Sequence, residues 1–215
     1  GDGEDGLDGR AVGARADDGR SALTYAAGFV GAGAAALKAW ADMWGTYLGR
    51  YKIKRGHDRR PVHTSKTCRV VFAKDQQAAK GEPRKVALKI MQNEEEYRNE
   101  IRAREDRQLD PAFVVEVLRA HDEARCLVMP RGDRSLFNAI AAERIAGVDP
   151  RKVKVIASEL AGCLRHLHAQ GAVHGDVKPR NAVRVGEQWK LIDLDATTEI
   201  GGEAGAKYSS AYCPP

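Results

Sequence analysis

The chain has 215 residues, of which 43% are hydrophobic and 30% charged, so it can bury a sizeable core and expose a polar surface. Its net charge of +5 is small, and a basic cluster at residues 50–60 lacks interleaved aromatic side chains, which argues against a nucleic-acid partner. The four cysteines are widely separated and form no CxxC pair. That spacing argues against a zinc site or disulfide framework and favours a reducing intracellular setting, the cytoplasm.

Residues 1–48 differ in amino-acid composition from the rest of the chain. Residues 1 to about 20 carry almost no large apolar side chains, so we expect this stretch to be disordered. The Ala-rich stretch that follows permits a helix, whose Trp and Leu residues recur at helical spacing. Its apolar part is too interrupted to span a bilayer, and no membrane partner is predicted. Because the chain does not begin with Met, we expect the natural start to lie upstream.

Short β-branched runs appear beyond Gly49 and indicate strands. The predicted strands are Cys68–Ala73, Lys85–Met91, Phe113–Leu118 and Arg125–Met129. One helical segment, about Glu94–Arg104, interrupts them, and Asn93 is a suitable N-cap for it. This part of the chain therefore predicts a sheet with one helix.

The second half of the chain is mainly helical in pattern. Asp149 and Pro150 form a good N-cap and first-turn pair, and Gly171 is a suitable stop for the helix between them. Its apolar stripe consists of Val153, Ile156, Leu160, Cys163, Leu164 and Leu167. Two short strands follow, Ala182–Val185 and Trp189–Ile192, joined by a tight turn.

These elements predict an α+β protein with two lobes. Residues 49–131 would form a small antiparallel β lobe with one helix. Residues 132–215 would form a partial, mainly helical second lobe, and residues 1–48 an extension before both.

The strongest chemical signal is the sequence HGDVKPRN, residues 174–181, followed ten residues later by LIDLD, residues 191–195. A carboxylate at Asp176 can orient a hydroxyl group and accept its proton, and Lys178 can neutralise charge on a transferred phosphoryl group. Asn181 and Asp193 flank a tight hairpin, so their oxygens can converge on Mg²⁺, which prefers oxygen ligands.

At these residues the sequence resembles the eukaryotic-type protein kinase family, whose catalytic loop is HRDxKxxN and whose metal loop is DFG. The resemblance implies a bilobal kinase fold that uses ATP and Mg²⁺. Asp176 would be the catalytic base, with Asn181 and Asp193 as metal ligands. The resemblance runs from about Tyr51 to Pro215, with the motifs in the family's order.

VALKIM, residues 86–91, resembles the family's VAIK motif, which implies that Lys89 holds the α- and β-phosphates of ATP. Its glutamate partner should lie on the following helix, where Glu96 and Glu100 both flank the inward face. We favour Glu100, because YRNEI resembles the family's helix and Glu96 stands at a capping position.

CLVMPRGDRSL, residues 126–136, is similar to the hinge between the two kinase lobes. Met129 would be the gatekeeper, with backbone groups from Pro130 to Gly132 facing adenine. Pro130 lacks an N–H, but the family uses a carbonyl at that place. By the same resemblance, Val70 and Ala87 would line the ATP site.

KYSSAYCPP, residues 207–215, resembles the end of an activation segment, the segment that contains Ser209 and Tyr212. Ser209 would match the hydroxyl residue that contacts the catalytic Asp and Lys in Ser/Thr kinases, and Lys178 also fits that class. The chain stops one residue before the expected Glu of the family's APE motif. We therefore expect a truncated domain with uncovered apolar surface and poor stability.

Three positions depart from the family's pattern. The loop His63–Cys68 has no glycine where GxGxxG is expected, which predicts a looser or differently shaped phosphate site. Gly175 replaces the arginine of HRD, which argues against activation by phosphorylation of the activation segment. Leu194 and Asp195 replace the Phe and Gly of DFG.

The sequence thus predicts an ATP-dependent serine/threonine protein kinase with a protein substrate. Two alternatives remain open at this stage. A small-molecule phosphotransferase also uses HGD, followed by Asn and a similar metal loop, although Lys178 and the activation-like tail favour a protein kinase. A pseudokinase scaffold fits the glycine-free loop, although such a scaffold has no chemical need for the charged positions that are all present.

Overall fold

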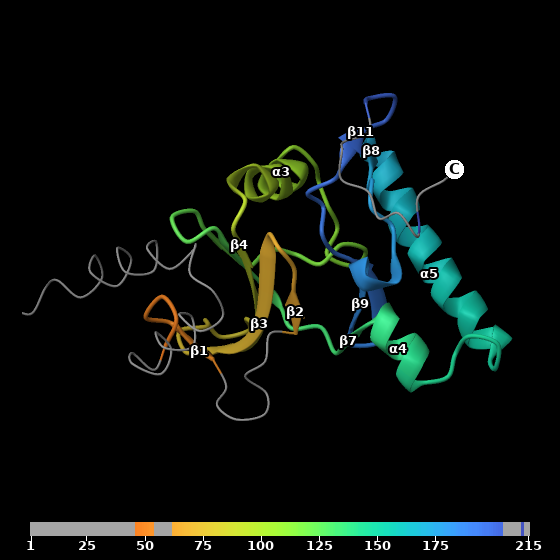
Figure 1. Cartoon of the computed structure of the whole chain (residues 1–215), viewed down its shortest axis with the longest axis horizontal. Helices are drawn as coiled ribbons and strands as arrows, with labels where there is room; N and C mark the ends of the chain where they lie inside the picture. The colour runs from red at the N-terminus through yellow and green to blue at the C-terminus, as the bar shows by residue number, and fades with distance from the viewer. Residues whose placement is uncertain (1–45, 54–61, 204–211, 213–215) are drawn as a thin grey trace, which may run out of the picture.

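The computed structural model describes residues 46–53, 62–203 and Tyr212, and shows two lobes joined by a short connection (Figure 1). Most of the predicted extension, residues 1–48, lies outside the described residues, as does Ser209. Within the described part of the chain, no helix combines the length and the apolar character that a membrane span requires.

The first lobe is an antiparallel sheet with one helix, α3 (Glu94–Glu105). Its described strands are β1 (Tyr51–Ile53), β2 (His63–Thr64), β3 (Cys68–Asp75), β4 (Lys85–Met91), β5 (Arg119–His121) and β6 (Cys126–Pro130). They run in the order β1-β3-β4-β6-β5, and β2 pairs with β3. Figure 1 shows α3 beside the sheet, on the side of the second lobe.

The second lobe contains two helices and several short strands in its described part. Its elements are β7 (Arg134–Ser135), α4 (Leu136–Ala142), α5 (Pro150–Ala169), β8 (Ala172–Val173), a 3₁₀ turn (Pro179–Asn181), β9 (Ala182–Val185), β10 (Gln188–Leu191) and β11 (Thr198–Glu199). The hairpin β9–β10 also pairs with β7, and β11 pairs with β8. The two-lobed α+β architecture predicted from the sequence is confirmed.

Strand β4 is central to the first lobe, because both of its faces are covered. Leu88 and Ile90 join the core between the sheet and Tyr51, while Met91 packs with Tyr97 of α3. Since side chains alternate across a strand, Lys89 lies on the opposite face from Leu88 and Ile90, toward the second lobe. The period of the strand therefore decides that this lysine points into the cleft.

Helix α3 begins and ends close to the predicted residues. The Asn93 side chain accepts hydrogen bonds from the backbone N–H groups of Glu95 and Glu96, at 2.8 and 3.2 Å, and so caps the helix. The predicted end at Arg104 differs from the observed end by one residue.

The predicted strand Phe113–Leu118 is wrong. The segment forms one bridge, with Val114 beside Leu191 of the second lobe, and the next strand starts only at Arg119. The Val115 N–H donates to Leu191 O, and Leu191 N–H donates to Phe113 O, each at 2.9 Å. The β-branched run thus reflects burial between the two lobes rather than a place in the sheet.

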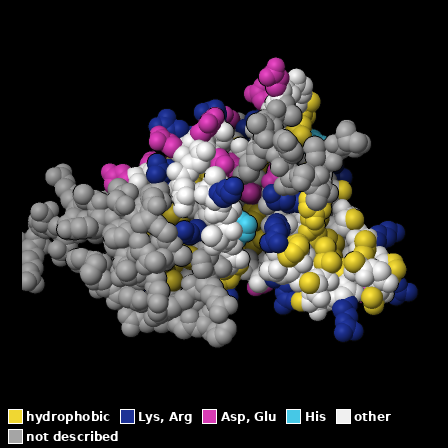
Figure 2. Space-filling view, in the orientation of Figure 1, with side chains coloured by type: hydrophobic (Ala, Val, Ile, Leu, Met, Phe, Trp, Pro, Cys, Tyr) yellow, Lys and Arg dark blue, Asp and Glu magenta, His cyan; other side chains and the backbone are white. Residues whose placement is uncertain are grey.

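Helix α5 has the predicted ends but buries less of its predicted stripe. The Asp149 side chain caps it through Lys152 N–H, and Gly171 beyond its end has φ +73°. Leu167 is fully buried, whereas Val153 is 45% exposed and is not part of the core. Figure 2 shows hydrophobic side chains gathered on this lobe, over α4 and α5.

Replacing Leu167 with Ala should lower the free energy of unfolding by about 2–5 kcal/mol, because this side chain fills the core between α5 and Leu194. Urea titration followed by circular dichroism measures the change. Val155→Ala on the same helix is the matched control; since Val155 is 56% exposed, its effect should stay within about 0.5 kcal/mol. Equal effects of the two variants would contradict the assignment of the core.

Candidate active site

Three elements bring their charged side chains together in the cleft. The Lys89 ammonium on β4 donates to Glu100 Oε2 of α3 at 2.9 Å and to Asp193 Oδ1, beyond β10, at 2.5 Å. Lys89 is 6% exposed and Glu100 is fully buried. Of the two glutamates considered from the sequence, Glu100 is therefore the one that pairs with Lys89.

The buried charge of Lys89 is maintained by these carboxylates. Burial alone would lower the pKa of the ammonium, but Glu100 and Asp193 outweigh it and the pKa of Lys89 is raised. Burial would likewise raise the pKa of the Glu100 carboxyl, yet Lys89 and Arg104 lower it. The pair is thus ionised on both sides at neutral pH, and removing one partner would leave an uncompensated buried charge.

The loop between β8 and the 3₁₀ turn arranges the second group of predicted residues. Asp176 is 4% exposed and accepts from Lys178 Nζ at 2.5 Å through Oδ2. The Asn181 amide donates to the same oxygen at 3.1 Å and to the Asp176 carbonyl at 2.9 Å. The structure therefore brings Asp176, Lys178 and Asn181 together, as their spacing in the sequence predicts.

His174 fastens this loop to the segment that carries Asp193. Its Nδ1 accepts from Asp176 N–H at 3.3 Å, which places the ring proton on Nε2, and Nε2 then donates to Ile192 O at 3.0 Å. Burial lowers the pKa of His174, so the ring is neutral at pH 7 and keeps this tautomer. The sequence pattern alone assigns His174 no role beyond its place in the HGD motif.

Gly175 is required by the close contact of two backbones. It has φ +78°, and a Cβ at this position would overlap the carbonyl oxygen of Ala196. The residue before Asp176 thus lies directly against the segment after Asp193. An arginine cannot occupy this position in this backbone, which gives a physical reason for the departure from HRD.

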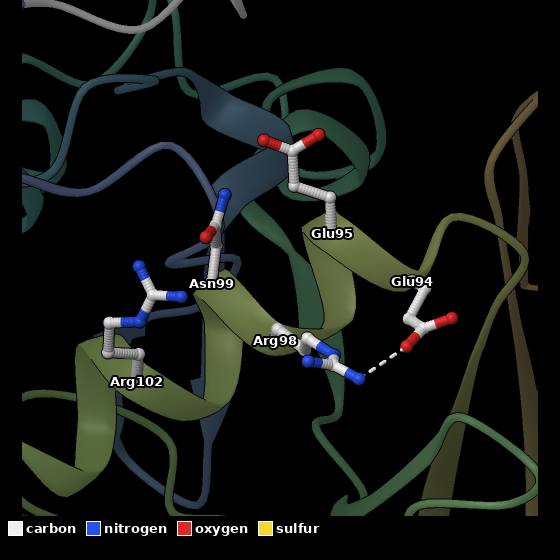
Figure 3. A pocket seen from close by; sticks show the side chains of 5 residues that line it. All are labelled: Glu94, Glu95, Arg98, Asn99 and Arg102. Atoms are coloured by element: carbon white, nitrogen blue, oxygen red, sulfur yellow. Dashed lines mark hydrogen bonds and ion pairs between the residues drawn. The ribbon is translucent and has the colours of Figure 1, made fainter.

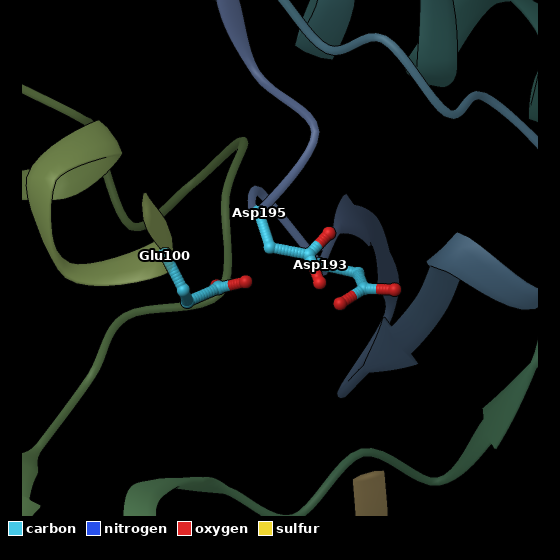
Figure 4. A group of neighbouring side chains, drawn as sticks. All are labelled: Glu100, Asp193 and Asp195. Carbon is cyan, nitrogen blue, oxygen red and sulfur yellow. The ribbon is translucent and has the colours of Figure 1, made fainter. Parts of the chain in front are cut away.

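The carboxylates of Glu100, Asp193 and Asp195 converge, with oxygens within 4.8 Å of one another (Figure 4). The Ile192 N–H donates to Asn181 O at 3.0 Å, so Asn181 lies next to the segment that carries Asp193 and Asp195. Carboxylate and amide oxygens are the kinds of ligand that a hard divalent cation such as Mg²⁺ prefers, and Asp193, Asp195 and Asn181 supply them here. Both Glu100 oxygens, by contrast, accept hydrogen bonds from Lys89, Arg104 and the Leu194 N–H. Asp195 is 6% exposed and was not among the predicted metal ligands.

The predicted ATP-lining residues share the face of the sheet that bears Lys89. Val70 lies opposite Lys89, and Met129 lies opposite Ala87. Directly opposed residues of antiparallel strands point to the same side, and Ala87 is two residues before Lys89. These four side chains therefore form one surface.

The connection between the lobes follows β6. Pro130 is its last residue and lies opposite Val86, on the other face from Met129. At Gly132 a Cβ would lie 3.3 Å from the Arg184 carbonyl oxygen, so the connection packs tightly against β9.

The glycine-free loop, His63–Cys68, is a tight turn between β2 and β3. The Ser65 hydroxyl accepts from Cys68 N–H at 3.0 Å and closes the turn.

His63 lies opposite Val70 and hence in one row with Lys89, on the face toward the cleft. Burial and the cations Arg180, Lys178 and Lys89 lower the pKa of His63, against an opposite effect of Asp193. His63 stands at the first of the expected glycines, but its side chain had no predicted role in the site.

Of the two residues predicted in the activation segment, the structure describes one. Tyr212 is 55% exposed, and Ser209 lies outside the described residues. Cys68, Cys126 and Cys163 are buried and form no disulfide with one another.

A shallow hollow of about 370 Å³ lies on the outer face of α3, away from Lys89 (Figure 3). It is lined by Glu94, Glu95, Arg98, Asn99 and Arg102. Arg98 and Glu94 form an exposed ion pair of 2.6 Å there. The hollow contains both signs of charge from a single helix and is not part of the site.

Residues 67–215 match the protein kinase domain family. The chain belongs to the protein kinase family. It is 34% identical over 94 residues to mitogen-activated protein kinase kinase 10 of Arabidopsis thaliana, a match that covers 42% of this chain and 30% of that protein. The crystal structure of another kinase domain has a TM-score of 0.62 at 14% identity, over 76% of this chain and 56% of that chain, and shows the same fold.

Within this kinase, the contact between Gly175 and Ala196 predicts a large effect of a single methyl group. Gly175→Ala should lower the free energy of unfolding by about 2–5 kcal/mol, because left-handed φ strain adds to backbone overlap. Gly186→Ala is the matched control: Gly186 has φ +62° but nothing within 4 Å of its Cβ position, so only strain of about 1–2 kcal/mol is expected. Equal losses in urea unfolding would show that the contact with Ala196 has no importance.

Proposed function

We propose that this kinase transfers the γ-phosphoryl group of ATP, with Mg²⁺, to Ser or Thr hydroxyls of protein substrates. The observation that carries the proposal is the pairing of the Lys89 ammonium with the carboxylates of Glu100 and Asp193. Lys89 shares its face of the sheet with Val70 and Met129. Lys89 would hold the α- and β-phosphates, and Asn181 and Asp193 would hold the metal.

Asp176 would orient the substrate hydroxyl and accept its proton as the hydroxyl oxygen bonds to phosphorus and ADP departs. Its carboxylate is held for this role by Lys178 and Asn181, which both donate to Oδ2. Lys178 remains beside the transferred group, where its charge offsets the phosphoryl oxygens. Bound Mg²⁺ supplies charge neutralisation at the phosphates.

The Ser/Thr class is supported by Lys178, two residues after Asp176, and by Ser209 at the place of the hydroxyl residue in the activation segment. The nearest alternative class is a pseudokinase. The burial of Lys89, Glu100, Asp176 and Asn181 in one hydrogen-bonded site favours an enzyme, because a scaffold has no need for their convergence.

Asp176→Asn should lower phosphate transfer to Ser- and Thr-containing peptides by about 10²–10⁴-fold, because the carboxylate that accepts the proton is lost. MgATP affinity by calorimetry should change little, since Asp176 is assigned to the hydroxyl and not to the nucleotide. Radiolabel transfer to peptides with one Ser, Thr or Tyr acceptor measures the rate and the class. Equal background transfer by both proteins would reject the enzyme and favour the scaffold.

Lys89→Met should abolish MgATP binding by calorimetry, because the phosphates lose their cation and Glu100 loses its partner. Lys85→Met is the matched control, since Lys85 lies on the same strand but is exposed. Unchanged binding in the Lys89 variant would place the phosphates elsewhere.

His63→Ala should weaken MgATP binding several-fold but leave adenosine binding unchanged. Because His63, Val70 and Lys89 lie in one row, the imidazole would lie near the phosphates held by Lys89. The loop has no glycine that would let its backbone close over those phosphates. Thr64→Ala is the control on the other face of β2. Equal losses of ATP and adenosine affinity would assign His63 a structural role only.

A further inference from the structure

Arg104 binds the carboxylate oxygen of Glu100 that does not contact Lys89. It lies one helical turn after Glu100, and its Nε and Nη2 donate to Glu100 Oε1 at 3.1 and 2.7 Å. The other oxygen, Oε2, accepts from Lys89 Nζ at 2.9 Å and from Leu194 N–H at 2.8 Å. Both oxygens of the carboxylate are thus held by two donors each.

This pair differs from an ordinary surface pair on a helix. An exposed ion pair at this spacing stabilises a helix only weakly. Here the Arg104 side chain is 12% exposed and the Glu100 side chain 1% exposed, so little water competes for their charges. The planar guanidinium also fixes the angle at which the carboxylate faces Lys89.

Arg104 also ties helix α3 to the segment between the lobes. Its third donor, Nη1, binds the Val115 carbonyl at 2.7 Å. Val115 N–H in turn donates to Leu191 O, two residues before Asp193. Lys89 and Arg104 therefore give α3 two separate connections to the segment that carries Asp193.

We propose that Arg104 is a positioning residue: it holds Glu100, and with it α3, in the arrangement that pairs with Lys89, and it contacts neither nucleotide nor substrate. Its effect on phosphate transfer rests on the proposed function. Its effect on the position of Glu100 does not, and can be measured without a nucleotide.

The first measurement is amide hydrogen exchange at Leu194 in the nucleotide-free protein, because this N–H reports whether Glu100 Oε2 is in place. Arg104→Met should speed this exchange by about tenfold or more, the effect of losing a charge-assisted bond. Arg102→Met is the matched control: Arg102 lies on the exposed face of α3, where Figure 3 shows it, and should leave the exchange unchanged.

Arg104→Lys keeps the charge, but lysine has no planar fork with which to bind both Glu100 and Val115. The Leu194 amide of this variant should therefore exchange faster than in the wild type and more slowly than in Arg104→Met. This variant also tests the proposal if Arg104→Met fails to fold. Adding Arg104→Met to Glu100→Gln should produce little further change, because Arg104 acts through Glu100.

We also expect Arg104→Met to lower the affinity for MgATP about tenfold, because Glu100 loses a charge-assisted hydrogen bond and no longer holds Lys89 in place. Unchanged Leu194 exchange in folded Arg104→Met and Arg104→Lys, or an equal change in Arg102→Met, would overturn the proposal. If the wild type bound no MgATP, the proposed function would fail, whereas the exchange result would still decide the role of Arg104.

Discussion

The ammonium group of Lys89 is buried within a sheet, and an isolated charge at that depth would be strongly unfavourable. Its neutralisation by Glu100 and Asp193 requires that β4, α3 and the segment after β10 meet at one place. Glu100 and Asp193 are 11 and 104 residues from Lys89 along the chain. The positions of both lobes around the cleft depend on satisfying this one charge.

A second constraint operates on the other side of the cleft and involves no charge. The backbone of Gly175 lies against Ala196, and the His174 ring links Asp176 N–H to Ile192 O. Together these contacts fix the distance between the loop that carries Asp176 and the segment that carries Asp193. Gly175, which replaces the arginine of HRD, thus contributes to the geometry of the site through its backbone.

Much of this arrangement could be predicted from the sequence, because it depends on local period and spacing. The alternation of VALKIM points Lys89 into the cleft, and the interval within HGDVKPRN brings Asp176 and Asn181 together. The failures are long-range. Phe113–Leu118 has strand-like composition but is buried between lobes. Arg104 has the spacing of a surface pair, and only the packing of α3 shows that it is buried.

The same geometry bears on how such a kinase is controlled. An arginine at position 175 would serve to read a phosphate on the activation segment, but the backbone contact with Ala196 excludes a side chain there. In its place, the pairing of Lys89 with Glu100 is already complete in the described structure, supported by Arg104 and the Leu194 N–H. The contacts that hold α3 therefore come from within the chain itself. If control acts on the Lys89–Glu100 pair, we expect it to act by breaking the contact between Arg104 of α3 and Val115, rather than by adding a phosphate beside Gly175.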